Sequence, residues 1–399
     1  MSAPFCGGAS YASESSLNGS ISVREEYDDN IFLTQNDHVY DFITRVTPAI
    51  GIKYKTTWLD LKLDDTFYAW YYARRDKAYW SNSMNFMAKV TAINNFLYID
   101  LADNYSNVVL EPRGPSTAGN LNVNRTDTNV GSVSPYIKYD ISASSSVKLG
   151  GAYTDIWYRS EGVSRQQYKG FLAVEQRFSP ALGFILGGEW LADRPKGDEP
   201  DDDQTAAYGT LTYLFTPRLK FEGMGGFRWL RFSDNRDFDR PIYNAAIAYA
   251  LRDSGKIELR AASEYGTTPL FGIVQNDKQE ASVVYFLSAA VASVRAGVYH
   301  KTDKYVEVVR TDEALGCTAG FDLNPLPRVK FQVTGGYERD RYSPAAGRRE
   351  LYYASTGLDY KLTPKATIGV TYGYNRSRGG GITDRYTDNL AGVQAKLEL

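Results

Sequence analysis

The sequence predicts an all-β fold, a single antiparallel up-and-down β-barrel of about 18 to 20 strands. Three observations predict it: apolar and polar residues alternate along many segments, short turns recur at intervals of roughly 36 to 43 residues, and longer polar connections separate those turns. A strand with one apolar and one polar face fits a transmembrane barrel, whose outer surface meets lipid and whose interior meets water. We therefore expect a place in a bacterial outer membrane, with short periplasmic turns and long external loops.

The composition supports strands and excludes other classes of protein. Tyr 31, Phe 18, Trp 6 and Gly 35 suit pleated strands and tight turns. Lys+Arg 45 against Asp+Glu 47 leave a net charge of -2 without a basic block, so we expect no nucleic-acid partner. The longest charge-free apolar stretch, from Ala281 to Val294, is too short for a membrane-spanning helix.

The N-terminus reads as a leader followed by one barrel domain. Ser10 and Ala12 have the small-residue spacing of a signal-peptide end, so we interpret residues 1–13 as a signal remnant or leader and residues 14–399 as the barrel. An unstructured leader is the alternative. Cys6 and Cys317 are too few for a disulfide framework, and no Cys-x-x-Cys occurs.

The alternation marks individual strands. We expect the first strand near Ser20 to Tyr27 and the last near Asn389 to Leu399. Asp65 breaks an alternation that begins at Leu59, which predicts a bulge near Asp64 and Asp65. The apolar sets of the clearest strands are Leu59, Leu61, Leu63; Ile257, Leu259, Ala261; Val329, Phe331, Val333; and Val393, Ala395, Leu397, Leu399.

Nine short turns join these strands in pairs. Several have the form aromatic or Leu, then Ser or Thr, then Pro, with proline pre-set for the turn. The turns lie at Lys55-Thr56, Asn94-Asn95, Ser142 to Ser145, Ser179-Pro180, Thr216-Pro217, Asp253 to Gly255, Ser288-Ala289, Asn324-Pro325 and Thr363-Pro364. Nine turns imply eighteen strands, and the first and last strands raise the number to 20, with both termini on the periplasmic side.

Longer polar connections lie between the turns. They are Leu110 to Arg125, Asp193 to Gln204, Phe232 to Arg240, Thr302 to Glu313, Asp340 to Arg349 and Asn375 to Arg385. A β-propeller fits less well, because its blades need four short strands per period. A soluble sandwich would need a second sheet to bury every apolar face, which lipid supplies here.

Aromatic residues at strand ends indicate girdles at the headgroup level, with ordinary cross-strand packing as the alternative. They are Tyr71, Tyr72, Tyr79, Trp80, Tyr136, Tyr139, Tyr153, Trp157, Tyr158, Tyr352, Tyr353, Tyr372 and Tyr374.

Specific residues then resemble a known family. The opening Glu25-Glu26-Tyr27-Asp28-Asp29-Asn30-Ile31-Phe32-Leu33, the later Asn124-Arg125-Thr126-Asp127 and the following Ser132-Val133-Ser134-Pro135-Tyr136 are similar to outer-membrane, porin-like β-barrel proteins associated with exosortase and exopolysaccharide gene clusters. The resemblance covers the whole chain in layout. It implies a surface-export or porin role and no catalytic residue. The final Leu399 departs from the Phe or Trp that commonly ends barrel chains.

Catalytic and metal motifs are weak. His38 and His300 are the two histidines, one in the first external loop and one near the outer end of a strand, and no nucleophile is paired with either by sequence. The carboxylates Glu25, Glu26, Asp28 and Asp29 read as ordinary strand-face charges. The acidic run Asp198, Glu199, Asp201, Asp202, Asp203 lacks a calcium-loop pattern and reads as a solvated external loop. We expect no enzyme, cofactor or metal.

The polar faces of the strands predict the lumen. Both signs of charge mix there, which predicts a hydrated conduit with weak ion selectivity or, alternatively, a plugged and salt-bridged interior. The predicted lumen-lining residues are Asp60, Lys62, Asp64, Lys220, Glu222, Arg228, Lys256, Glu258, Arg260, Glu264, Arg328, Lys330 and Glu338.

The expected function is passage of hydrophilic solutes, including exported polysaccharide, across the outer membrane. The alternative is a non-conducting scaffold that docks a partner, for example a sleeve for redox proteins. Besides lipid and solute, periplasmic export partners are then expected. Tyr68, Trp70 and Tyr72 would form a sugar-stacking track on the pore wall if no bulge forms, whereas with a bulge Phe67, Ala69 and Tyr71 would point inward; a place in the outer girdle is the alternative.

Overall fold

The structure is a computed structural model, and it describes residues 13–117, 119–288, 291–344, 347–379 and 385–399. The predicted leader lies outside the described residues except for Ser13, and the first strand begins at Glu14. Among the described residues, no helix is long and apolar enough to cross a membrane.

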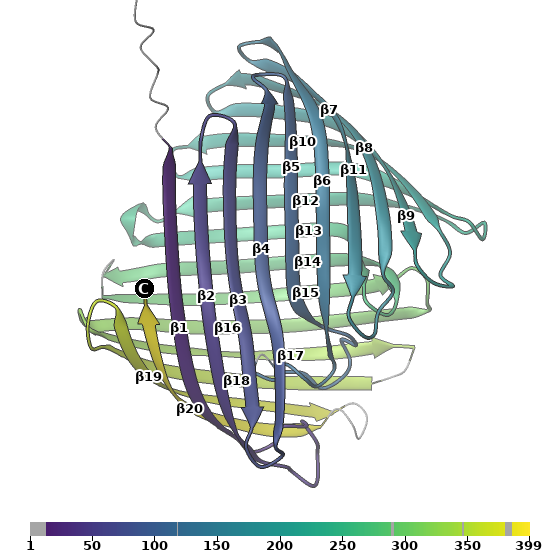
Figure 1. Cartoon of the computed structure of the whole chain (residues 1–399). Helices are drawn as coiled ribbons and strands as arrows, with labels where there is room; N and C mark the ends of the chain where they lie inside the picture. The colour runs from purple at the N-terminus through teal and green to yellow at the C-terminus, as the bar shows by residue number, and fades with distance from the viewer. Residues whose placement is uncertain (1–12, 118, 289–290, 345–346, 380–384) are drawn as a thin grey trace, which may run out of the picture.

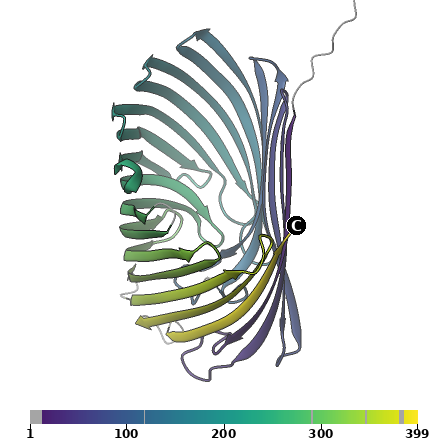
Figure 2. The same cartoon turned by 90° about the vertical axis from the view of Figure 1, so that its left-hand side faces the viewer.

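Twenty strands form one closed antiparallel barrel, as the sequence predicts (Figures 1 and 2). Each strand pairs with the next along the chain, and β20 pairs with β1 from Ser20–Glu398 to Asp28–Leu390. The ring therefore has no free sheet edge along this seam, and lipid can surround it without meeting unpaired backbone groups.

The strands are mostly 13 to 18 residues long. Their bounds are β1 (Glu14–Asp28), β2 (Asp41–Lys55), β3 (Leu59–Tyr72), β4 (Lys77–Ile93), β5 (Leu97–Val109), β6 (Arg125–Ser142), β7 (Ser145–Tyr158), β8 (Arg165–Ser179), β9 (Leu182–Pro195), β10 (Asp202–Thr216), β11 (Leu219–Phe232), β12 (Asp237–Ala250), β13 (Gly255–Thr268), β14 (Gly272–Ser288), β15 (Ala292–Tyr305), β16 (Arg310–Leu326), β17 (Val329–Ser343), β18 (Gly347–Lys361), β19 (Ala366–Gly379) and β20 (Tyr386–Glu398). A single 3-10 turn, η1 (Arg252–Ser254), joins β12 to β13.

Eight of the nine predicted short turns lie at the end of the barrel that holds the two ends of the chain, and the ninth, Ser288-Ala289, lies partly outside the described residues. There the backbone N–H of Leu399 donates to the carbonyl of Gly19 at 2.9 Å. The Ser/Thr-Pro motif works through its hydroxyl: Thr216 Oγ1 accepts from the backbone N–H of Arg218 at 3.2 Å and of Leu219 at 3.1 Å. The side-chain oxygen thus accepts two backbone N–H groups of the turn and closes it around the proline.

The opposite connections are shorter than the sequence predicts. Of the six predicted long loops, 110–124 keeps nearly its predicted bounds, whereas the predicted Asp193 to Gln204 shrinks to 196–201 because β9 runs to Pro195 and β10 begins at Asp202. The predicted loops Asp340 to Arg349 and Asn375 to Arg385 lie partly outside the described residues. The strands continue past the lipid, where both of their faces are polar. The apolar–polar alternation vanishes there although backbone pairing continues, and for this reason the sequence predicts loops where the structure has strand ends.

The predicted bulge at Asp64 and Asp65 is wrong. β3 stays in one register with β4 from Leu59–Val90 to Tyr72–Lys77. The break in alternation is instead a charged residue, Asp65, on the face that carries Leu61 and Leu63.

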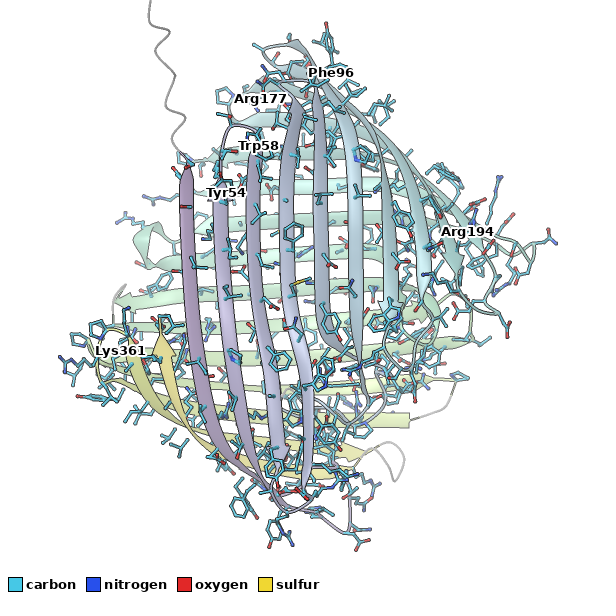
Figure 3. All side chains as sticks on the ribbon, in the orientation of Figure 1. Tyr54, Trp58, Phe96, Arg177, Arg194 and Lys361 are labelled. Carbon is cyan, nitrogen blue, oxygen red and sulfur yellow. The ribbon has the colours of Figure 1, made fainter. Side chains whose placement is uncertain are left out.

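The outward face of the barrel is apolar and aromatic. Large exposed side chains at the short-turn end include Tyr54, Trp58 and Phe96, with 38%, 54% and 40% of their surface exposed (Figure 3). Phe42 and Trp229 lie toward the other end of their strands, at 51% and 37%. Such rings on a continuous apolar surface match the two girdles of a lipid-embedded barrel.

Candidate functional site

Loop 110–124 folds into the barrel. It leaves the wall between β5 and β6, yet it contacts strands on either side of the β1–β20 seam. Arg45 on β2 donates to the carbonyl of Gly119 at 2.7 Å, Asn122 donates to the hydroxyl of Tyr72 on β3 at 2.8 Å, and the hydroxyl of Tyr386 on β20 donates to the carbonyl of Ser116 at 2.8 Å. Loop segments are visible inside the ring of strands in Figure 2.

Ion pairs fix the other side of the loop to β16. Arg113 Nη2 lies 2.5 Å from Asp312 Oδ1, and Arg310 Nη2 lies 2.7 Å from Glu111 Oε1. Arg310 also pairs with Asp312 at 2.6 Å. Because three of these side chains are mostly shielded from solvent, the pairs are screened less than surface ion pairs are.

A single arginine on β18 holds the start of the loop. Arg349 is buried and donates to the backbone carbonyls of residues 112–114 at 3.0 to 3.2 Å. Its charge is matched by Asp340 on β17, at 2.8 Å. The loop is therefore clamped at several points and crosses the lumen instead of lying free outside it.

The end of the β13–β14 hairpin is a second inward-folded element. β12 pairs with β13 only as far as Tyr243–Ser263, so the rest of the hairpin leaves the wall. Ile273 then packs on Leu230 and Phe232 of β11, and the carbonyl of Pro269 accepts from the backbone N–H of Val163 in the β7–β8 loop at 2.8 Å. Both elements narrow the external half of the barrel.

The contacts of loop 110–124 identify the inward face of the wall. Arg45, Tyr72, Asp312 and Arg349 must point inward to reach it, and the strand registers carry this assignment round the ring. The structure places the predicted lumen-lining residues on that same face: Asp60, Lys62 and Asp64 on β3; Lys220, Glu222 and Arg228 on β11; Lys256, Glu258, Arg260 and Glu264 on β13; and Lys330 and Glu338 on β17. Arg328 lies in the turn just before β17.

The inward charges at the short-turn end form pairs along single strands. A lysine is followed two residues later by an acid, as in Lys62–Asp64 at 2.6 Å and Lys396–Glu398 at 2.9 Å. The other such pairs toward this end are Lys220–Glu222, Lys256–Glu258 and Lys138–Asp140. Their side chains are about half exposed, for example 42% and 51% for Lys62 and Asp64. Residues two apart on a strand share a face, so the acid two residues later neutralises the charge of each of these lysines.

A charged network that is not predicted from the sequence lies deeper in the lumen. Lys169 and Arg228 both pair with Glu189, each at 2.5 Å, and Arg228 also donates to Gln204 at 3.0 Å. In the sequence, Lys169 and Glu189 each stand beside an aromatic residue in a short apolar–polar alternation. Glycines interrupt that alternation, so the signal is weak.

Comparison with solved structures supports the fold. The chain is similar to the siderophore receptor PirA from Acinetobacter baumannii, with a TM-score of 0.56 and 10% identity over 96% of this chain and 80% of that one. It is also similar to the ferric enterobactin receptor PfeA from Pseudomonas aeruginosa, with a TM-score of 0.54 and 9% identity over the same shares. This chain has the closed-barrel fold of outer-membrane proteins. No protein-family model and no curated protein matches its sequence.

The aromatic residues of β3 divide between the two faces of the barrel wall. Phe67 and Tyr71 point outward and are 40% and 41% exposed. Tyr68, Trp70 and Tyr72 lie on the inward face, but Trp70 and Tyr72 are only 5% and 3% exposed because Leu121 and Ile31 from two loops pack over them. They therefore belong to the anchor of loop 110–124 and offer neither an open stacking track nor an outer girdle.

The two histidines lie apart in the fold and make local contacts. The His38 ring is within hydrogen-bond distance of the Gln35 carbonyl, 3.3 Å away, and the His300 ring is 3.0 Å from the side chain of Gln279. His300 lies on the outward face of β15. Neither contacts a nucleophile within the described ranges.

The acidic run at 198–203 is less solvated than the sequence predicts. Asp201 and Asp203 are half exposed, but the Glu199 carboxylate accepts a hydrogen bond from the buried Arg165 at 2.8 Å and forms an ion pair with it. Burial raises the pKa of the Glu199 carboxyl, an effect that Arg165 opposes. The run is therefore partly a structural clasp between the β7–β8 and β9–β10 connections.

Proposed function

We propose that this barrel is a porin-like channel that passes small hydrophilic solutes across the outer membrane and performs no covalent chemistry on them. The half-exposed lysine–acid pairs on the inward face carry this proposal. Charged side chains with this much exposed surface must be hydrated, because their burial in a filled interior would cost several kcal/mol per ion. Barrels of about 16 to 18 strands already leave an aqueous channel, and this one has 20.

The pairing pattern suggests weak ion selectivity. Several exposed lysines of the short-turn end, among them Lys62, Lys220 and Lys256, have an acid two residues away, so much of this wall carries charge of both signs. Such a wall favours polar solutes of either sign or none. Strong selection would need unpaired charge of one sign at the constriction.

Loop 110–124 sets the size limit in this proposal. Its anchors on β2, β3, β16, β18 and β20 hold it across the lumen. A more specific version of this proposal is that the channel exports a polysaccharide. The resemblance of segments 25–33 and 124–127 to exopolysaccharide-associated barrels supports it. Burial of Trp70 and Tyr72 beneath the loop counts against an open stacking track for a polymer.

A scaffold that does not conduct is the second candidate, and one observation favours it. Two elements, loop 110–124 and the end of the β13–β14 hairpin, both cross the external half of the barrel. If together they close it, the barrel would serve to dock a periplasmic or surface partner.

Liposome swelling separates the two candidates. Purified protein in liposomes should admit small sugars rapidly and admit larger oligosaccharides progressively more slowly. A matched preparation of heat-denatured protein controls for leakage. If liposomes holding the folded barrel stay as tight as protein-free liposomes for every sugar, the channel proposal fails and the scaffold is favoured.

A further inference from the structure

Three carboxylates gather where the first and last strands close the barrel. Asp28 ends β1, Asp29 follows it, and Asp388 lies near the start of β20. One carboxylate oxygen of each lies within 4.8 Å of the other two. Asp28 and Asp388 are only 4% and 3% exposed, and Asp29 is half-buried. This cluster is not predictable from the sequence, because Asp388 is at the far end of the chain from the other two.

No basic side chain neutralises the cluster within the described part of the chain. Asp28, Asp29 and Asp388 form no ion pair there, and Arg24 and Arg45 are both engaged by Glu26. Buried charges in proteins are normally paired with an opposite charge or coordinate a metal. Two buried carboxylates side by side therefore need a cation or a proton between them.

The hydrogen bonds of the cluster leave one buried oxygen unused. Asp388 Oδ2 accepts from Asn375 at 3.1 Å, but Asp388 Oδ1 is buried and has no hydrogen-bond donor. Asp29 is held in place by Asn389, whose backbone N–H and side chain donate to its two oxygens at 2.7 and 2.6 Å. A buried oxygen without a hydrogen-bond donor is an atom that can coordinate a bound cation.

A cavity gives the cluster access to water. Its volume is about 510 Å³, and its lining includes Asp28, Asp388, Asn375 and, from the inward-folded loop, Gly119. Water in this space could fill the coordination positions that the carboxylates leave open, and it provides a route from the lumen.

We propose that Asp28, Asp29 and Asp388 bind a calcium ion that ties the first strand to the last beside loop 110–124. Calcium takes six to eight oxygen ligands in flexible geometry, and a mixture of carboxylates and waters supplies them. Magnesium demands a near-ideal octahedron and gives up its waters reluctantly, so it fits this half-open cluster less well. An affinity of roughly 10⁻⁴ to 10⁻³ M, as in extracellular calcium modules, would suffice outside a cell.

The test is calcium titration of the whole folded barrel in detergent after treatment with EDTA. Isothermal titration calorimetry should detect one site, and calcium should raise the temperature at which the heat-modifiable band converts to the denatured one. D28N and D388N should lose both effects. D201N, which removes an exposed acid from a loop, should keep both.

Two further measurements keep the outcome clear. D388N removes charge without changing shape, so in EDTA it should be at least as heat-stable as the wild type, which shows that a lost calcium response is not misfolding. The proposal is overturned if the wild type shows no calcium response, or if D28N and D388N respond as it does. It is also overturned if acidification stabilises the barrel while calcium does not bind, because the two carboxyls would then share a proton.

Discussion

Glu258 and Leu259 are neighbours on β13 that face opposite media. Leu259 is 51% exposed on the outward face, whereas Glu258 points inward beside Lys256. L259R should cost about 2 to 4 kcal/mol of folding free energy, because it places a charge against lipid near the middle of the barrel. E258R should be tolerated and should shift the channel toward anions.

Urea titration of the folded fraction in lipid vesicles measures the first effect, and the reversal potential under a salt gradient measures the second. Similar losses of stability at both positions would mean that the faces of β13 are assigned wrongly.

Asp65 is the exception on the outward face of β3. It lies opposite Met84 of β4 and Ile50 of β2, and its Oδ1 is buried without a donor. A carboxylate in that position is destabilising, so D65L should raise the free energy of unfolding. D64L, on the inward side of the same strand, is the control and should not raise it. A lower stability for D65L would contradict the conclusion that this carboxylate is destabilising.

Glu199 makes the folding stability of the barrel depend on pH. Burial raises the pKa of Glu199 in the folded state, so the folded state holds the proton more tightly than the unfolded state does. The contribution of Glu199 to the free energy of unfolding is therefore greatest below the ordinary glutamate pKa, and it is lost as the pH rises through the raised pKa. The melting temperature of the wild type minus that of E199Q should therefore fall as the pH rises from about 4 to 7. A difference that stays constant or grows over this range would contradict the assignment.

At the scale of elements, the sequence predicts the strands and turns well and the loops poorly. The alternation on β13 and β17 and the Ser/Thr-Pro turns are local signals, so nine turns and 20 strands follow from them. The inward path of loop 110–124 depends on Asp312, Arg349 and Tyr386, which lie far along the chain. No local pattern records such contacts, and the covered state of Trp70 could not be predicted for the same reason.

Arg349 offers a direct test of how the loop is held. R349Q removes the donors to the carbonyls of residues 112–114 and leaves Asp340 buried without its cation. The loop should then fluctuate, and single-channel recordings should show more frequent transitions between conductance levels. R348Q changes the adjacent, outward side chain and should record like the wild type. Equally quiet traces for both variants would show that Arg349 does not restrain the loop.

At the scale of the whole molecule, closure of the barrel and passage of water through its lumen have different origins. The closed ring with apolar, aromatic outer residues follows from the period of the sequence and the number of turns. Whether water passes through depends on loop 110–124 and on the β13–β14 hairpin end, which are tertiary features. The half-exposed ion pairs at the short-turn end indicate that this half of the barrel is hydrated.

The most direct test compares single-channel conductance in planar bilayers for the wild type and for a variant in which a short Gly-Ser linker replaces residues 112–122. We expect discrete steps for the wild type and steps several-fold larger for the variant, because the loop forms the narrowest part of a water-filled lumen. Closed membranes with both proteins, or steps of the same size, would contradict it.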